Sequence, residues 1–314
     1  MNKNTSKVLY ELGLDSRITT KQLAKKIRIS QQAASYSISH LQDQGILTSF
    51  QTIIDPARFG FVSVMVFYNY MQLEKTKQIK DHLVKHHYTS LVEELTEGSD
   101  LLVEFCVPNL SLFNKENRAF LHTFKRHIRM SEVYVVIVKH LFTRNYFTTS
   151  RNDHGIILAG DRDVIALKEK EKAVLKLLWE NPRTPITTMS EKCGLDPKAI
   201  LRIKKYLEQQ KVIRRYTIGI DTELLNLTRS YLLLELDYDD PQAIDKVIEY
   251  MKIHPNVIRV TKSIGQYELI ALIEKPEGKK IINDLRTHCK IANYKLVYSE
   301  KILKHTYVSP GIFE

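Results

Sequence analysis

Residues Thr19 to Asp55 read TTKQLAKKIRISQQAASYSISHLQDQGILTSFQTIID, and the rest of the chain is organised around this segment. A short first helix is predicted by apolar residues at helical spacing, which are Leu23, Ala24 and Ile27. Ser30 is placed to cap a second helix, whose buried positions are predicted to be Ala34, Ile38 and Leu41. Gly45 ends this helix, and residues 46–54 alternate as the strands of a small wing would. The pattern predicts a winged helix-turn-helix, whose second helix enters the major groove of DNA.

The second helix has a polar, uncharged face opposite its predicted core positions. Hydrogen-bonding side chains of a size that reaches base edges lie on it: Gln31, Gln32, Ser35, Tyr36, Ser39 and His40. The preceding helix supplies cations suited to phosphates, namely Lys25, Lys26 and Arg28. We therefore expect the first helix-turn-helix to read sequence through amides and hydroxyls.

Composition sets the class of protein. A chain of 314 residues with 43% hydrophobic and 26% charged residues is expected to fold into two or more globular domains. A net charge of +11 favours a polyanionic partner. No apolar run is long enough to span a bilayer and the N-terminus is polar, so a cytoplasmic, membrane-free protein is expected.

A second pattern follows the wing. DPARFG at 55–60 leads into a β-branched and aromatic strand at 61–73 and an amphipathic helix at 74–87. Two strands at 89–95 and 100–107, a helix at 110–128 and a strand at 132–147 complete the order β-α-β-β-α-β. This order is that of the split βαβ, ferredoxin-like sandwich.

The whole pattern then repeats. VIRRYTIGID at 212–221 matches ILTSFQTIID at 46–55. Asp196 with Pro197 would start the recognition helix of a second helix-turn-helix, and we call each helix-turn-helix a head. The predicted fold class is α+β, with two repeats of a winged helix-turn-helix followed by a βαββαβ domain. The predicted boundaries are 1–56 and 60–148, a linker at 149–163, then 164–222 and 226–308.

The second reading head differs in chemistry from the first. Its helix is basic, and the predicted DNA contacts are Lys198, Arg202 and Lys205, with Arg214 on the wing. The alternative for either head is a helix-turn-helix that has lost DNA binding and serves in packing.

Both halves resemble the Lrp/AsnC (leucine-responsive, feast/famine) transcription regulators, in which a winged helix precedes a RAM/ACT-like βαββαβ domain. The resemblance rests on ISQQAASYSISHLQDQGIL and DPARFG in the first half, and on LDPKAILRIKKYLEQQKVI, SIGQYELIALIE and KLVYSEKILKHTY in the second. It implies a double-stranded DNA-binding regulator that works as a homodimer or, since two units are fused here, as an internal pseudo-dimer. Lys211 stands where the family has a helix-ending glycine.

The resemblance also implies a small, amino-acid-like effector bound by two loops. The matching residues are Gly98, Ser99 and Asp100 in the first domain and Gly265, Gln266 and Tyr267 in the second. Two alternatives stay open: an architectural DNA-coating protein of low specificity, and an enzyme similar to the siroheme decarboxylases, which share this architecture. For the enzyme, the candidate residues are His122, His127, His140 and Arg144.

Neither a catalytic motif nor a metal motif is recognisable. The i, i+4 pair His82 and His86 lies in HLVKH, which lacks the glutamate of HExxH, and is expected on an exposed helix face. Three scattered cysteines predict reduced core residues. We therefore expect no metal, no cofactor and no enzymatic activity.

Overall fold

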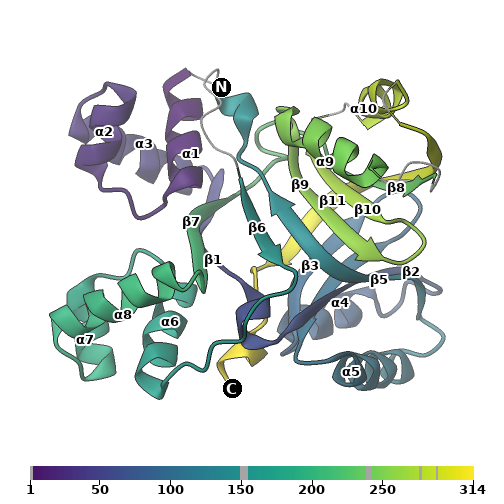
Figure 1. The fold of residues 1–314 in the computed structure, drawn as a ribbon, viewed down its shortest axis with the longest axis horizontal. Coiled ribbons are helices and arrows are strands. Elements are labelled where there is room, and N and C mark those ends of the chain that lie inside the picture. Colours follow the sequence, from purple (N-terminus) through teal and green to yellow (C-terminus); the bar gives the residue numbers. More distant parts are fainter. Residues whose placement is uncertain (1–2, 149–154, 238–241, 276–277, 288) are drawn as a thin grey trace.

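The computed structural model describes residues 3–148, 155–237, 242–275, 278–287 and 289–314. Two helical heads lie on one side of the molecule, and a large sheet with its own helices lies on the other (Figure 1). The predicted α+β class and the repeat of head and βαββαβ domain are confirmed.

The first head consists of α1 (Lys3–Leu14), α2 (Thr20–Ile27) and α3 (Gln31–Asp43). Thr19 and Gln22 form a capping box at the start of α2, and the Ser30 hydroxyl accepts a hydrogen bond from the Ala33 amide at 3.1 Å. The predicted inward positions of both helices are buried, as expected from their spacing.

The second head repeats this arrangement with α6 (Glu169–Glu180), α7 (Ile186–Cys193) and α8 (Pro197–Gln209). Asp196 caps α8 by accepting a hydrogen bond from the Ala199 amide at 2.9 Å, and Pro197 is the first helical residue, as predicted.

The wings differ from the prediction. Each head contributes one strand, β1 (Leu47–Ile54) or β7 (Ile213–Ile220), and the two strands pair with each other in a two-stranded antiparallel sheet. The strands also cross to the opposite head. The Thr217 hydroxyl of β7 donates to the Gly13 carbonyl of the first head at 2.9 Å, and the Thr52 hydroxyl of β1 donates to the Leu178 carbonyl of the second. Neither head is therefore a self-contained winged helix.

The first βαββαβ domain contains β2 (Val62–Tyr70), α4 (Thr76–Lys85), β3 (Thr89–Leu95), β4 (Leu101–Val107), α5 (Leu110–Thr123) and β5 (Ile128–Leu141). The second contains β8 (Arg229–Leu236), α9 (Ala243–Ile253), β9 (Val257–Ile264), β10 (Leu269–Glu274), α10 (Gly278–Leu285) and β11 (Ile291–His305). Their strands form one sheet in the order β2-β4-β3-β11-β8-β10-β9-β5-β6.

The sheet closes on itself, because β5 pairs with β2 as well as with β9. Eight strands thus form a barrel, with β3–β11 and β5–β9 as the two seams between the domains. Helices cover the outside, and inside the barrel the two domains share one apolar core that includes Phe67, Tyr134 and Leu233. The expected internal pseudo-dimer is therefore present within one chain, whereas pairing of two chains stays a prediction.

Part of the predicted linker is a strand. The segment β6 (Ile156–Ala159) pairs with the end of β5, and the Ala159 amide donates to the buried Asp55 carboxylate at 2.9 Å. Gly155 and Gly160 flank this strand, and both have positive φ angles. Glycines in a polar segment are typical of linkers, but here they are the turns at the two ends of a short strand. Among the described residues, no helix is long and apolar enough to cross a bilayer.

Gly45 and Lys211 occupy matching positions just after the recognition helices α3 and α8, so the two units can be compared at one backbone position. Gly45 has a φ of 72° and Lys211 a φ of 57°, so both occupy the left-handed region, where a lysine is strained and a glycine is not. Lys211 is exposed, so replacing it loses no packing. We predict that Lys211→Gly raises the free energy of unfolding by up to about 1 kcal/mol, measured by denaturant titration. Gly45→Lys should lower it by a similar amount, and equal stabilities of Lys211→Gly and the parent would contradict this.

Candidate functional site at the wing end of the barrel

Residues on the inward faces of the strands change from apolar to charged toward one end of the barrel. Along β8 the inward residues are Leu233, Tyr231 and then Arg229, and along β10 they are Ile270, Leu272 and then Glu274. This charged end lies against the wing strands, where the side-chain amide of Gln51 on β1 donates to the His305 carbonyl at 3.1 Å. We call it the wing end.

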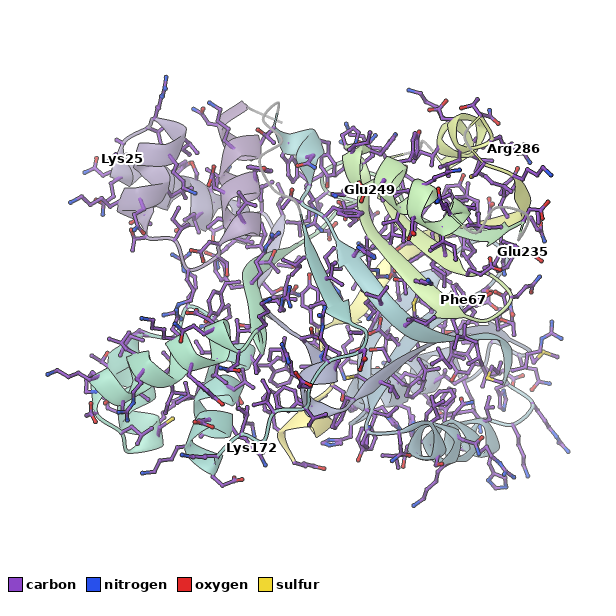
Figure 2. All side chains as sticks on the ribbon, viewed as in Figure 1. Lys25, Phe67, Lys172, Glu235, Glu249 and Arg286 are labelled. Carbon is purple, nitrogen blue, oxygen red and sulfur yellow. The ribbon has the colours of Figure 1, made fainter. Side chains whose placement is uncertain are left out.

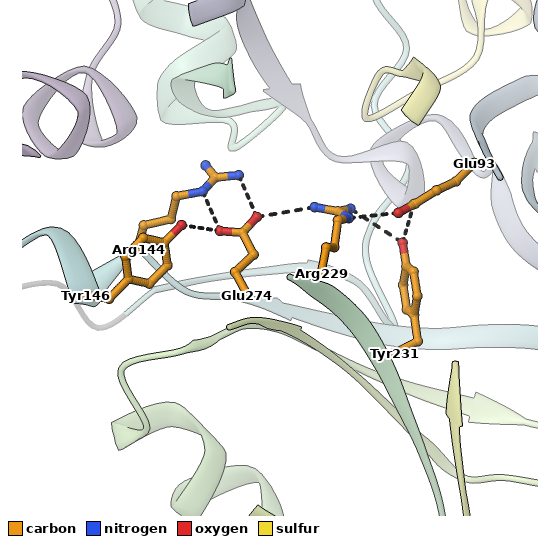
Figure 3. A network of polar contacts seen from close by, with 6 residues as sticks. All are labelled: Glu93, Arg144, Tyr146, Arg229, Tyr231 and Glu274. Atoms are coloured by element: carbon orange, nitrogen blue, oxygen red, sulfur yellow. Dashed lines mark hydrogen bonds and ion pairs between the residues drawn. The ribbon is translucent and has the colours of Figure 1, made fainter. Parts of the chain in front are cut away.

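Glu274 is the centre of one half of the charged network (Figure 3). Arg144 holds its carboxylate with two nitrogens, Nε at 2.8 Å and Nη2 at 3.1 Å, and the Tyr146 hydroxyl donates to it as well. Burial alone would raise the pKa of Glu274, but the Arg144 and Arg229 guanidinium groups hold that pKa below its ordinary value.

Arg229 connects the two domains. Its Nε donates to Glu93 of the first domain at 2.8 Å, and its Nη1 donates to Glu274 of its own domain at 3.3 Å. The Tyr231 hydroxyl donates to Glu93 at 2.5 Å, so this carboxylate has partners on both oxygens. All four residues are at most 5% exposed, so this is a buried, closed ionic network.

A second buried pair lies on the first domain's side of the same end. The Lys139 ammonium is 2.5 Å from the Glu104 carboxylate, which also accepts a hydrogen bond from Ser90 at 3.1 Å. Burial opposes ionisation of Glu104, but Lys139 and Arg259 lower the pKa of its carboxyl. Glu104 and Glu274 are therefore both ionised at neutral pH.

Two adjoining cavities lie between the wing end and the wings. The inner one, of about 70 Å³, is roofed by α1 and the wing strands, and its cationic lining consists of Arg144, Arg215, Arg229 and Arg259. The outer one, of about 520 Å³, lies between β7 and β11, and shares four lining residues with the inner one: Arg144, Arg229, His305 and Tyr307. The chain thus places a concave, mainly cationic site where the heads meet the barrel.

His305 is neutral in this setting. Burial, and then the charges of Arg229, Arg259 and Arg144, lower its pKa well below the ordinary value. Burial also raises the pKa of the neighbouring Tyr307. The site therefore offers a neutral imidazole and a phenol beside fixed guanidinium charges.

The predicted contacts of the first head lie on its surface. All six polar residues of the α3 face are exposed, and Tyr36 is 68% exposed with its ring stacked on His40 at 5.5 Å between centroids. The three cations of α2 and its C-cap are exposed too, although Lys26 pairs with Glu11 at 2.8 Å. Lys25 projects on the side of the head away from the barrel (Figure 2).

The second head keeps most of its predicted contacts at the surface. Lys198, Arg202 and Lys205 are exposed on α8. Arg214 differs, because its side chain is only 16% exposed and its Nη1 lies 4.0 Å from the buried Asp55 carboxylate. The structure therefore places Arg214 as an internal partner of Asp55 rather than on the open edge of a wing.

The predicted effector loops lie at the opposite end of the barrel from the charged network. The 265–267 loop follows β9 beside the C-terminal end of β8, whereas Arg229 begins β8. Lys295 contacts the other loop through the Gly98 carbonyl at 3.4 Å and pairs with Glu132 at 2.5 Å. Ser99 is buried, and Asp100 accepts a hydrogen bond from the Tyr70 amide at 2.7 Å. Tyr267 is buried against Tyr134, and Gln266 is exposed.

The four residues named for tetrapyrrole chemistry are not brought together. His122 is exposed on α5, His127 follows that helix, and His140 lies on β5 with its ring 6.5 Å from that of Phe142. Only Arg144 lines the wing-end cavities, where the histidine is His305 instead.

Metal-binding geometry is not found among the described residues, where no three His, Cys, Asp or Glu side chains gather. His82 is exposed as predicted, but His86 is half-buried, because its Nε2 lies 3.4 Å from Glu116 on α5. The three cysteines are free thiols, buried at Cys106 and partly buried at the other two.

Sequence reasoning missed the wing-end residues Glu93, Glu104, Arg229, Arg259 and Glu274. A usable signal was present for three of them, since Glu104, Arg259 and Glu274 interrupt or end apolar runs, which are LLVEFCV at 101–107, VIRV at 257–260 and LIALIE at 269–274. Charged residues at such positions are buried only when they are paired or functional.

Fold and site define a two-unit winged-helix protein with a ligand-sized cavity between its heads and its barrel. A family model described as winged helix-turn-helix DNA-binding matches residues 1–48. An uncharacterized HTH-type transcriptional regulator of Pyrococcus furiosus is 32% identical over 108 residues, which are 33% of this chain and 68% of that protein. The HTH-type transcriptional regulator LrpA of Pyrococcus horikoshii is 28% identical over 117 residues, 37% of this chain and 80% of LrpA.

The chain belongs to the Lrp/AsnC family, in a duplicated form. Over its full length it is similar in fold to the siroheme decarboxylase NirDL, with a TM-score of 0.62 and 18% identity. The NirDL crystal structure with an iron-uroporphyrin III analogue gives a TM-score of 0.64 at 17% identity, and each match covers 98% of this chain and 94% of NirDL.

Arg229 should be essential to the barrel. Arg229→Leu leaves Glu93 and Glu274 buried with fewer partners, and such a change destabilises a protein by about 3–5 kcal/mol. We predict a loss of this size in denaturant or thermal unfolding. The control is Lys80→Leu, which breaks the partly exposed pair with Glu94 and should cost less than about 1 kcal/mol. Equal losses for the two variants would contradict the structural role of the network.

Proposed function

We propose that this chain is a sequence-specific double-stranded DNA-binding regulator with two unequal reading heads. The observation that carries the proposal is the open polar face of α3. Its side chains are exposed and are of types that hydrogen-bond with bases in known ways, although Gln31 also donates to the Thr20 hydroxyl at 3.5 Å. The sequence relatives of 28–32% identity, which are HTH-type transcriptional regulators, support the same function.

The two heads divide the work in this proposal. α3 reads base edges, with Gln31 or Gln32 suited to adenine, while the lysines of α2 bind phosphates. α8 contributes charge, with Arg202 suited to guanine and Lys198 and Lys205 to phosphates. Binding of an amino-acid-like effector at the two far-end loops stays a prediction. Lys295 lies beside Gly98 and Tyr134 beside Gly265, so these two side chains occupy space next to the loops.

The paired wings support a fixed arrangement of the heads. β1 follows α3 and β7 follows α8 with only a short turn between, and the two strands are hydrogen-bonded along their length. The separation of the two recognition helices is thereby set within one chain, so the proposed operator has two half-sites at one preferred spacing.

Variants of the two heads test this proposal. Gln32→Ala with Tyr36→Ala should lose about 1–3 kcal/mol of discrimination between the selected site and competitor DNA, because interactions with base edges carry specificity. Arg202→Ala with Lys205→Ala should instead lower the slope of affinity against salt, by about one for each phosphate that the variant no longer neutralises. Both are measured by fluorescence anisotropy over a salt series. Unchanged discrimination in the first variant would remove α3 as the reader.

A second candidate function is decarboxylation of a tetrapyrrole such as siroheme. The observation that favours it is the full-length fold similarity to NirDL, which covers 98% of this chain, whereas the match to LrpA covers 37% of it. The wing-end cavities would supply arginines for the substrate's carboxylates, and His305 and Tyr307 beside them. In such a reaction a C–C bond breaks, CO₂ leaves, and a proton replaces it on carbon.

This candidate has its own measurement. If it holds, siroheme incubated with the protein under reducing, anaerobic conditions loses CO₂ at a rate proportional to protein concentration, as read by mass spectrometry. His305→Gln should lower that rate, whereas the exposed His122→Gln should leave it unchanged. Substrate that stays intact while the protein binds a selected DNA site would eliminate the enzyme and retain the regulator.

A further inference from the structure

Arg259 is a buried guanidinium with two unused donors. The residue is 6% exposed and lines the inner cavity, and its Nε and Nη2 atoms are buried with no hydrogen-bond partner. Its charge acts on the buried Glu104 carboxylate, but no residue that the structure describes accepts a hydrogen bond from these two donors. Buried donors are costly when unsatisfied, so they call for a hydrogen-bonding partner.

The two unused atoms identify the chemistry of that partner. Nε and Nη2 form one edge of the guanidinium, and Arg144 uses the same edge to hold both oxygens of the Glu274 carboxylate. Side-by-side donation from two nitrogens matches the two oxygens of a carboxylate. The edge of Arg259 is therefore built for a second carboxylate.

The surroundings hold this edge in place. The Arg259 guanidinium carbon lies 5.7 Å from the centre of the Tyr231 ring, and that of Arg229 lies 5.9 Å from the same ring. Tyr231 is itself fixed by its hydrogen bond to Glu93. Arg259 is thus oriented by a neighbour in the closed network without being a hydrogen-bonded member of it.

Charge balance points the same way. Four cations of the network and its surroundings, Arg144, Arg229, Arg259 and Lys139, face three buried carboxylates, Glu93, Glu104 and Glu274. An added carboxylate would reduce this excess. Water filling the inner cavity would satisfy hydrogen bonds but leave the excess charge in place.

We propose that the inner cavity binds the carboxylate of a small organic acid on the Nε and Nη2 atoms of Arg259, with the rest of the molecule in the outer cavity. The inner volume of about 70 Å³ suits one carboxylate group, and the outer volume of about 520 Å³ suits the body of a metabolite. This site lies at the opposite end of the barrel from the loops implied by the family resemblance.

The proposed ligand would touch both parts of the molecule. Ile53 of β1 and Thr217 of β7 line the inner cavity together with Arg259 of the barrel. Binding would therefore tie the wing pair to the barrel, and backbone amides of β1 and β7 should exchange more slowly with the ligand present. DNA binding is not required for this inference, so its failure and that of the proposed function are distinguishable.

The test uses the full chain and matched pairs of probes: acetate with acetamide, succinate with succinamide, and citrate with its trimethyl ester. Binding is followed by calorimetry and by the shift in melting temperature. We expect each carboxylate to bind in preference to its neutral counterpart, and Arg259→Leu to weaken that binding by at least about tenfold. Arg118→Ala, which removes an exposed arginine of α5, should bind the carboxylates as the parent does.

The stability of the unliganded variants gives an independent readout. Arg259→Leu loses the interaction with Glu104 but also removes two unsatisfied buried donors, so it should lower the melting temperature much less than Arg229→Leu, which breaks hydrogen-bonded ion pairs. The proposal is overturned if Arg259→Leu is destabilised as strongly as Arg229→Leu. It is also overturned if neutral probes or inorganic phosphate bind as well as the carboxylates.

Discussion

The ion pair between Arg229 and Glu93 is the interaction on which the rest of the structure depends. It joins the two βαββαβ domains inside the barrel, and the bond from Arg229 to Glu274 continues it across the second domain. Charged groups at this depth are stable only as a complete network, because each one loses its hydration on burial. The domains of one chain are therefore held in one arrangement, and everything placed on the barrel inherits that arrangement.

The wings extend this constraint to the heads. β1 and β7 pair with each other, and each packs on the head from which it does not come, so the first head's core contains Ile218 and the second head's core contains Ile54. The same strands form the roof over the charged end of the barrel. Because β1 follows α3 and β7 follows α8, a ligand that displaces these strands in the cavity would also displace the two recognition helices.

Local features of the sequence predicted local structure well. Ser30 and Asp196 cap the helices assigned to them, and the repeated βαββαβ order follows from strand and helix periodicity. The exchange of wing strands was not predictable, because an alternating segment does not reveal which distant segment pairs with it. For the same reason Arg214 was assigned to DNA, although the fold turns it toward Asp55. Arg259 was not predicted as a site residue, because the sequence does not show which residues lie beside it inside the barrel.

The proposed recognition of specific double-stranded DNA sites is tested most directly by selection from sheared genomic DNA at two salt concentrations. Fragments retained by the purified protein are sequenced after washing at low and at high salt. A regulator with two linked heads predicts a recurrent motif that survives the higher salt, with two half-sites at one preferred spacing. Retention without a motif, disappearing as salt rises, would contradict sequence-specific recognition and indicate an architectural, charge-driven DNA-binding protein.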